Sequence, residues 1–318
     1  MTAKSYELTP MNVGATVRGI DPADIGDAEL GKALYADWLR YGFLVFRDLP
    51  LDNDQHIAFS NHFGVAEIHP LPAIRAAENP LFMELGGKKP GKAYVFDGKL
   101  LTGRVPWHRD TAYTLDICKG AVLRVVQRPA EGGNTGFCDT AAAYDALPEP
   151  MKRKIETLEC KATLKLDPFD FKYGMTWTTA RDATDEEVPD NPINVPLEEQ
   201  NRFPSIVIPM VITHPETGRK SIYISPTYLD CVIGMEEDEG HALLTYLVDH
   251  LLKPDFVHTH EWREGDVVTW DNRRMLHNAE GYPPSTVRRL LRTTLAGPLH
   301  IGRMFDPDAK QRAADLVD

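Results

Sequence analysis

The sequence lacks the features that mark several large classes of protein. It has four cysteines in 318 residues, Cys118, Cys138, Cys160 and Cys231, and no two of them form a C-x-x-C pair. This spacing argues against a disulfide framework and a thiolate metal site, and it is typical of a reducing cytoplasm. No apolar run reaches the about 18 residues of a membrane span, and the first residues contain no apolar signal-peptide stretch. We therefore expect a cytoplasmic protein without a membrane span.

Positive charge is also scarce. The chain has 35 Lys and Arg residues against 47 Asp and Glu residues, which gives a formal charge of −12. Because no basic stripe is present to neutralise phosphates, we expect no nucleic-acid or anionic-membrane partner. A small anionic ligand remains compatible with this balance, since a few arginines can form a positive pocket inside an acidic protein.

The composition and the hydrophobic pattern indicate a folded, mainly β protein. Hydrophobic residues make up 42% of the chain, and no repeat or flexible linker divides it, so we predict one domain over residues 1–318. Periodicity predicts helices over 28–40, 52–64, 140–158 (interrupted by proline) and about 236–252. It predicts strands over 42–49, 121–127, 205–214, 221–225, 266–272 and 288–297. Many short strands with flanking helices suggest a double-stranded β-helix, or jelly-roll, core.

One long segment, residues 165–204, has no clean periodicity. It holds several acidic residues, five prolines and the aromatic residues Phe169, Phe171, Tyr173 and Trp177. Long loops in compact domains are usually functional, so we expect this insertion to form an active-site lid.

The segment VPWHRDTAY holds the first candidate metal ligands. In an extended strand, residues i and i+2 point to the same face, so His108 and Asp110 project together while Arg109 points away. A hydrogen-bonded His–Asp pair on a surface strand would give the same short pattern.

The segment WDNRRMLHNAEGY supplies a third candidate ligand, His277, which could equally be an ordinary partly buried histidine. Two histidines and one carboxylate form the facial triad of non-haem Fe(II) oxygenases.

A third segment, RRLLRTTLAG, adds two arginines. By the same alternation Arg288, Leu290 and Arg292 share one face. An arginine that points into a β core is costly unless it meets an anion, and its planar guanidinium matches a carboxylate. The alternative is a solvated strand face, which suits Arg289. With Leu290 between them, we expect Arg288 and Arg292 to face a polar pocket.

Over nearly its whole length the sequence resembles the taurine dioxygenase / 2,4-dichlorophenoxyacetate dioxygenase family of Fe(II)/2-oxoglutarate enzymes. The resemblance lies in five ordered blocks: GFLVFRDL–QHIAFSNHFG–IHP, WHRD, PAEGGNTGFCDTAAAYDALP, THPETGRKSIYIS and WDNRRMLHNAEGY–RRLLRTTLAG. It implies a dioxygenase that uses Fe(II), 2-oxoglutarate and O₂ to hydroxylate a small organic substrate, with release of succinate and CO₂. It also implies a homo-oligomer, either a dimer or a tetramer.

The resemblance assigns roles to individual residues. It implies that His108, Asp110 and His277 bind iron, and that Arg288 and Thr135 bind the distal carboxylate of 2-oxoglutarate. It places Arg292 near the 1-carboxylate of 2-oxoglutarate and the acidic group of the substrate. It gives His69 and Tyr228 as substrate contacts. Thr135 could instead be a turn residue, His69 a loop residue and Tyr228 plain core.

Two departures from the taurine pattern concern the substrate. Pro72 replaces a tyrosine, and Arg104 lies near a position that holds asparagine in the taurine enzymes. Arg104 could bind a substrate carboxylate, or it could pair with the acidic lid. With His69 and Arg292 it suggests an anionic substrate: a carboxylate, a sulfonate or a sulfate ester.

The intact Asp110 bears on the outcome of the reaction. Halogenating relatives replace this carboxylate with a small residue, so the sequence predicts hydroxylation. Desaturation or another oxidation would use the same iron site. A zinc hydrolase with the same ligands would leave Arg288 and Thr135 without a role, and a non-catalytic jelly-roll that binds a small anion is the remaining alternative.

Overall fold

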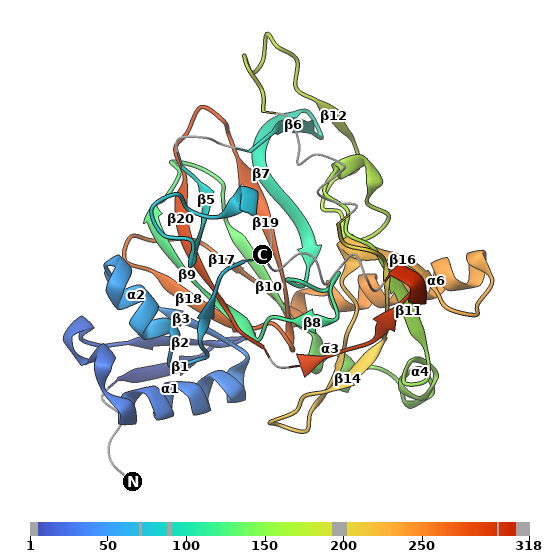
Figure 1. Ribbon diagram of the computed structural model, residues 1–318, viewed down its shortest axis with the longest axis horizontal. Coiled ribbons are helices and arrows are strands. Elements are labelled where there is room, and N and C mark those ends of the chain that lie inside the picture. The colour runs from blue at the N-terminus through green and yellow to red at the C-terminus, as the bar shows by residue number, and fades with distance from the viewer. Residues whose placement is uncertain (1–5, 70–71, 88–90, 193–201, 298, 310–318) are drawn as a thin grey trace.

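Two facing β-sheets form the jelly-roll core of the computed structural model, which describes residues 6–69, 72–87, 91–192, 202–297 and 299–309 (Figure 1). The larger sheet has the strand order β1 (Glu7–Pro10), β2 (Ala15–Arg18), β3 (Phe43–Phe46), β18 (Val267–Asp271), β9 (Gly120–Gln127), β20 (Arg289–Leu295) and β4 (Ala66–Glu67), and β5 (Phe82–Gly86) also pairs with β20. The smaller sheet has the order β12 (Ala180–Asp182), β6 (Ala93–Phe96), β7 (Lys99–His108), β19 (Met275–Tyr282), β10 (Thr135–Asp139) and β17 (Val257–His260).

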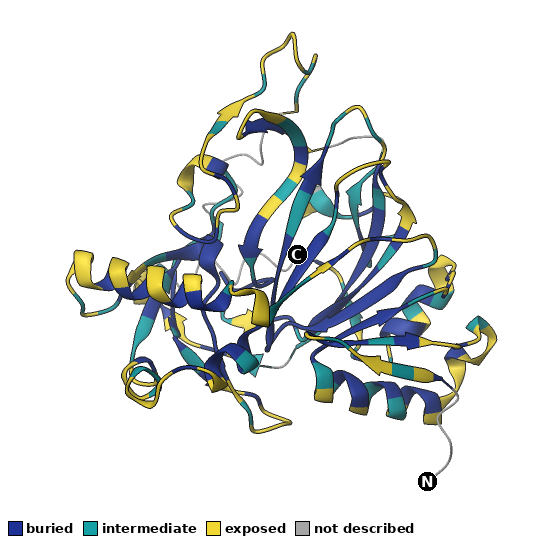
Figure 2. Ribbon diagram, turned by 180° about the vertical axis from the view of Figure 1, so that it is seen from behind, coloured by how far each residue is buried: buried dark blue, intermediate teal, exposed yellow. Residues whose placement is uncertain are grey.

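The space between the two sheets is filled with aromatic and aliphatic side chains. Phe43 of β3 stacks on Phe137 of β10 with ring centroids 4.0 Å apart, and Phe137 also contacts Trp270 of β18. These residues are almost completely buried, and the strands that carry them form the continuous buried region in Figure 2. Burial of one such side chain stabilises the fold by roughly 1.5–3 kcal/mol, so this layer fixes how the two sheets face each other.

Two helices cover the outer face of the larger sheet. In α1 (Ala28–Tyr41), the Asp27 side chain accepts hydrogen bonds from the first free amides, and Gly42 ends the helix in the left-handed conformation at φ 74°. The shorter α2 (Asn53–Ser60) begins with a capping box between Asp52 and Gln55. Both helices pack apolar side chains against the sheet, which closes this side of the core.

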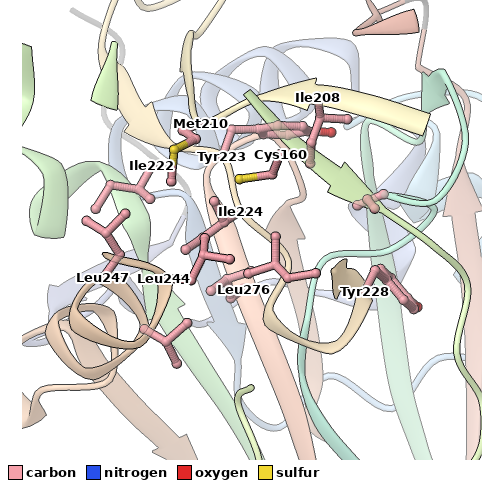
Figure 3. Packing of buried hydrophobic residues seen from close by; sticks show 14 of the residues in the cluster. Cys160, Ile208, Met210, Ile222, Tyr223, Ile224, Tyr228, Leu244, Leu247 and Leu276 are labelled. Carbon is pink, nitrogen blue, oxygen red and sulfur yellow. The ribbon is translucent and has the colours of Figure 1, made fainter. Parts of the chain in front are cut away.

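A third layer lies beside the smaller sheet. It contains the sheet β16 (Leu229–Val232), β11 (Glu159–Ala162), β13 (Ile206–Pro209) and β22 (Arg303–Met304), and the helices α3 (Thr140–Asp145), α4 (Glu149–Ile155) and α6 (Glu237–Leu251). Leu244 and Leu247 of α6 pack with residues of these strands in one buried cluster, which also includes Tyr228 (Figure 3). The two short pairs are β14 (Val211–Thr213) with β15 (Lys220–Ile222), and β8 (Asp116–Ile117) with β21 (Leu299–His300).

Short 3₁₀ turns complete the described chain. They are η1 (Pro22–Gly26), η2 (Pro72–Ile74), η3 (Pro168–Asp170), η4 (Pro226–Tyr228), η5 (Pro254–Phe256) and η6 (Pro307–Ala309). Within the described segments, none of the helices combines the length and the apolar character of a transmembrane span.

Most of the predicted elements are present, and their ends differ for local reasons. The helix predicted over 140–158 is two helices, α3 and α4, separated at Pro148. The strand predicted over 205–214 is also divided, into β13, which pairs with β11, and β14, which pairs with β15.

The segment 165–204 is not wholly a loop, which corrects the sequence prediction. It contains η3 and β12, and β12 pairs antiparallel with β6 at the edge of the smaller sheet. The sequence of β12, Ala-Arg-Asp, has no apolar alternation that could reveal it as a strand. Residues 193–201 of the predicted lid lie outside the described residues.

Candidate metal centre and its cavity

The two candidate histidine ligands lie opposite each other on neighbouring antiparallel strands. His108 is the last residue of β7, and it pairs in register with His277 of β19. Their ring centroids are 4.1 Å apart. His108 Nδ1 lies 2.8 Å from Pro106 O, so this nitrogen donates to the carbonyl and Nε2 carries the lone pair that can bind a metal.

Asp110 completes the group just beyond the end of β7. Its carboxylate oxygens lie 3.8 Å from His108 Nε2 and 3.6 Å from His277 Nε2. One potential ligand atom from each of the three residues lies within 4.8 Å of the others. Two imidazoles and a carboxylate at this spacing fit a divalent transition metal, and three protein ligands leave coordination positions open. Arg109 points the other way and is fully buried.

Burial and charge keep the three candidate ligands in the protonation states that bind metals. Burial lowers the pKa of His108 and lowers that of His277 well below its usual value, so both imidazoles are neutral. Burial alone would raise the pKa of Asp110, but the Arg292 guanidinium and the two histidines hold it well below its usual range. The carboxylate is therefore ionised.

Arg292 lies against the Asp110 carboxylate. Arg292 Nη1 donates to Asp110 Oδ1 at 2.9 Å, and Nη2 lies 2.8 Å from Oδ2. Both side chains are buried, and the guanidinium also lies over the Trp270 ring at 5.4 Å. The strand alternation correctly placed Arg292 on the cavity face of β20. The structure adds a contact to a candidate metal ligand that the sequence did not predict.

Arg288 faces the same cavity but has no carboxylate partner among the described residues. Only 5% of its surface is exposed, and the one hydrogen bond of its guanidinium to the described residues runs from Nε to Gly133 O at 3.3 Å. Burial lowers its pKa to about 10, so the guanidinium is still charged at neutral pH. A side chain at Gly133 (φ 70°) would crowd Arg288, because an added Cβ would lie 3.0 Å from its Cδ. The arrangement is suited to a bound carboxylate.

Thr135 lies at the start of β10 and also lines the cavity. Its hydroxyl oxygen accepts a hydrogen bond from Trp262 Nε1 at 3.1 Å, within the core. Because the indole N–H can only donate, the hydroxyl proton of Thr135 is left to donate elsewhere. Trp262 therefore orients Thr135 as a donor. Nothing in the sequence indicated this role of Trp262.

The triad, Thr135, Arg288 and Arg292 line one cavity of about 470 Å³. His69 and Tyr228, the other two predicted contacts, also line it, and both are buried. The Tyr113 ring packs edge-on against Tyr228 with centroids 5.2 Å apart and forms part of the same wall. The remaining walls are largely apolar and include Ile74, Met83, Val105, Leu123, Leu164, Leu166 and Trp270.

Arg104 is not among the residues that line this cavity. Its Nη2 donates to Thr176 O at 2.7 Å, and its guanidinium lies 5.3 Å from the Phe96 ring and 5.2 Å from the Trp177 ring. This position does not support the expected substrate contact. It favours the alternative, a link to the 165–204 segment, although the partner atoms are those of Thr176 and not an acidic side chain.

A β-bulge explains the position of Arg104. The pairing of β7 with β19 shifts register between His277 and Ala279, so that Val105 and not Pro106 lies opposite Ala279. The extra residue reverses the alternation of β7, and Gly103 and Val105 share the cavity with His108. Simple period-two counting from His108 would have placed Arg104 on the cavity face.

Comparison with known proteins gives matches over most of the chain. The family model described as "Taurine catabolism dioxygenase TauD, TfdA family" matches residues 4–294. The chain is 33% identical to the (S)-phenoxypropionate/alpha-ketoglutarate-dioxygenase of Sphingobium herbicidovorans over 304 residues, which cover 92% of this chain and 96% of that protein. It is 29% identical to an alpha-ketoglutarate-dependent 2,4-dichlorophenoxyacetate dioxygenase of Burkholderia sp. (strain RASC), with 93% of this chain and 95% of that protein covered.

Solved structures give the same picture of the fold. A taurine dioxygenase from Burkholderia xenovorans superposes with a TM-score of 0.72 at 25% identity, over 98% of this chain and 99% of that chain. The structure of AAD-2 in complex with Mn(II) and N-oxalylglycine gives a TM-score of 0.69 at 26% identity, over 93% of this chain and 99% of that chain. The similarity thus extends over most of the chain.

Proposed function

The chain belongs to the taurine catabolism dioxygenase TauD, TfdA family, and on that basis we propose that His108, Asp110 and His277 hold its catalytic Fe(II) ion. The enzyme is a non-haem Fe(II)- and 2-oxoglutarate-dependent dioxygenase. Neutral imidazoles and an ionised carboxylate suit a divalent ion, and Pro106 O fixes the tautomer of His108.

When Fe(II) is bound, it supplies the activation of O₂, with 2-oxoglutarate as the two-electron reductant. The oxo-acid leaves as succinate and CO₂. One oxygen atom of O₂ enters succinate. The other is inserted into a C–H bond of the substrate, which becomes an alcohol. The chain contributes the ligands, the binding groups for two small molecules and a largely apolar cavity that excludes bulk water.

The observation that carries this proposal is the buried Arg288 guanidinium, which faces the triad cavity without a carboxylate partner in the described chain. A buried, unpaired charge is costly, and a bound carboxylate offsets that cost. We assign the distal carboxylate of 2-oxoglutarate to Arg288, with the Thr135 hydroxyl as a second donor. The Trp262 hydrogen bond keeps that hydroxyl proton directed away from the indole.

For the primary substrate we propose a small anion with an apolar body, and a carboxylate in the first place. The apolar walls formed by Val105, Leu164 and Leu166 suit such a body, and His69 and Arg292 are the polar groups beside them. Two similar enzymes carry phenoxypropionate and 2,4-dichlorophenoxyacetate in their names, and both of these compounds have a carboxylate and an aromatic ring. A sulfonate or a sulfate ester is the next class to test.

We also propose that residues 165–204 act as a lid over the substrate side of this cavity. Leu164, just before this segment, and Leu166, near its start, both line the cavity. The chain is further proposed to work in the cytoplasm as a homodimer or homotetramer. Sedimentation velocity and cell fractionation test these two statements, and a monomeric or a secreted protein would contradict them.

An anaerobic titration tests the central proposal. Fe(II) and 2-oxoglutarate together should give a weak visible charge-transfer band, and its absence would exclude the proposed co-substrate site.

A panel of aryloxyalkanoates, sulfonates and sulfate esters tests the substrate class. Each compound is scored by the succinate that forms in the presence of Fe(II) and ascorbate. Succinate formation at background for the whole panel would instead favour a non-catalytic, anion-binding protein.

A further inference from the structure

The turn that carries Asp110 is held by a buried amide that the proposed reaction does not use. β7 ends at His108, so the backbone of Asp110 lies outside the strand ladder. The next residue, Thr111, has a φ of 53°, in the left-handed region. For a β-branched residue this conformation is strained, and it persists only where the surrounding structure fixes it.

Asn272 bonds both backbone groups of Asp110. Its Oδ1 accepts from Asp110 N at 3.0 Å, and its Nδ2 donates to Asp110 O at 2.8 Å. The same Nδ2 lies 3.1 Å from Cys118 O, on the far side of the turn. Because Nδ2 faces two carbonyl oxygens and Oδ1 faces an N–H, the amide can be oriented in only one way.

Asn272 is itself fixed within the core. It has no exposed surface. Its backbone N–H donates to Lys119 O at 3.0 Å, and its carbonyl oxygen accepts from Arg109 Nη1. It therefore cannot move without breaking several buried hydrogen bonds.

Asn272 connects the two segments that carry the candidate ligands Asp110 and His277. It lies in the turn between β18 and β19, and β19 carries His277. One side chain thus ties the segment that holds His277 to the turn that holds Asp110. Arg292 fixes the other end of Asp110, because it contacts the carboxylate and not the backbone.

We propose that Asn272 is a positioning residue that sets the place of Asp110 relative to His108 and His277, and so the affinity of the site for its metal. This proposal rests on the metal site described under the proposed function. Loss of a partner that orients a metal ligand typically weakens metal binding by about 10–100-fold.

The test measures Co(II) binding to metal-free protein, by its visible spectrum and by calorimetry. Asn272→Ala should raise the Co(II) dissociation constant by about 10–100-fold and change the spectrum. The control is Thr269→Val in β18, the strand that leads into the turn of Asn272. It removes one buried hydrogen bond, from Thr269 Oγ1 to Ala121 O at 2.9 Å, which touches no ligand. Thr269→Val should destabilise the metal-free fold and leave the Co(II) affinity unchanged.

Each outcome has a separate meaning. If Asn272→Ala lowers only the thermal midpoint of the metal-free protein, and binds Co(II) like the wild type, the residue is merely structural and the proposal fails. If Asn272→Ala does not fold, Asn272→Ser is measured in its place. Failure of both variants to fold would also overturn the proposal, because the fold itself would then need the amide. If the wild type does not bind Co(II), the metal site and not the role of Asn272 is wrong.

Discussion

Arg292 contacts both carboxylate oxygens of Asp110, at 2.9 Å for Nη1 to Oδ1 and 2.8 Å for Nη2 to Oδ2. This pairing makes a candidate metal ligand part of a buried ion pair. The arginine lowers the pKa of the carboxylate and limits its rotation. Arg292 thus acts on the metal site through Asp110, in addition to any contact with 2-oxoglutarate or substrate.

Arg292→Lys should lower kcat/KM by about tenfold or more, because an ammonium group cannot contact both oxygens in the way that a planar guanidinium does. Co(II) binding should weaken as well. The matched control is Arg274→Lys, which alters another buried arginine–aspartate pair, with Asp139, away from the cavity. If Arg274→Lys weakens Co(II) binding to the same extent, the effect is a general loss of stability and not a property of the metal site.

Arg288→Ala should raise the KM for 2-oxoglutarate steeply while Co(II) affinity stays the same. A charge-assisted hydrogen bond is worth about 1.5–3 kcal/mol, which corresponds to roughly 10–100-fold. The neighbouring Arg289→Ala is the control, because Arg289 pairs with Glu84 at 3.1 Å and does not line the cavity. An unchanged KM for Arg288→Ala, or an equal rise for both variants, would mean that another group binds the co-substrate.

Trp262→Phe should raise the KM for 2-oxoglutarate by a smaller factor, about 2–10-fold. The change removes one neutral hydrogen bond to Thr135 Oγ1, and such a bond is worth roughly 0.5–1.5 kcal/mol. A double-mutant cycle checks this expectation. It compares the KM of the wild type, Trp262→Phe, Thr135→Val and the variant that carries both changes. If the two changes were additive, Trp262 would not act through the threonine hydroxyl.

Several parts of this site could be predicted from the sequence because their chemistry is local. The H-x-D motif correctly brought His108 and Asp110 together, although Asp110 lies in a turn beyond β7 and not in an extended strand. Alternation placed Arg288 and Arg292 on the same cavity. Helix α1 was predictable within a residue, since an aspartate cap and a left-handed glycine mark its ends.

Other parts depend on contacts between distant segments and could not be predicted. Trp262 and Thr135 are far apart in the chain, and neither residue type suggests that pairing. An asparagine directly after a strand is typical of a turn, and only the fold brings the amide of Asn272 to Asp110. The side of β7 on which Arg104 lies could not be predicted either, because it depends on a bulge, and a bulge depends on the partner strand.

Asp271, next to Asn272, predicts a pH effect on stability that is independent of catalysis. Burial alone would raise its pKa, but hydrogen bonds from Arg273 and His214 lower it to about 2. A carboxyl whose pKa is lower in the folded state stabilises the fold above its unfolded pKa of about 3.9, and this stability is lost as the pH falls toward 2.

Asp271→Asn should therefore lower the free energy of unfolding at pH 7 by about 2 kcal/mol and flatten its decline between about pH 4 and pH 2. Urea unfolding at a series of pH values measures both effects. A variant with the same acid dependence as the wild type would show that other carboxyl groups dominate acid unfolding.

The position of Arg104 predicts an effect on the 165–204 segment and not on co-substrate binding. Its hydrogen bonds to Thr176 and its contacts with Phe96 and Trp177 hold this segment against β6 and β7. Arg104→Ala should make limited proteolysis within 165–204 faster and leave the KM for 2-oxoglutarate unchanged. Arg181→Ala is the matched control, since Arg181 pairs with Glu187 inside the same segment and not with β7. If instead the proteolysis rate were unchanged and the KM for the primary substrate rose at least tenfold, Arg104 would bind substrate, as the sequence first suggested.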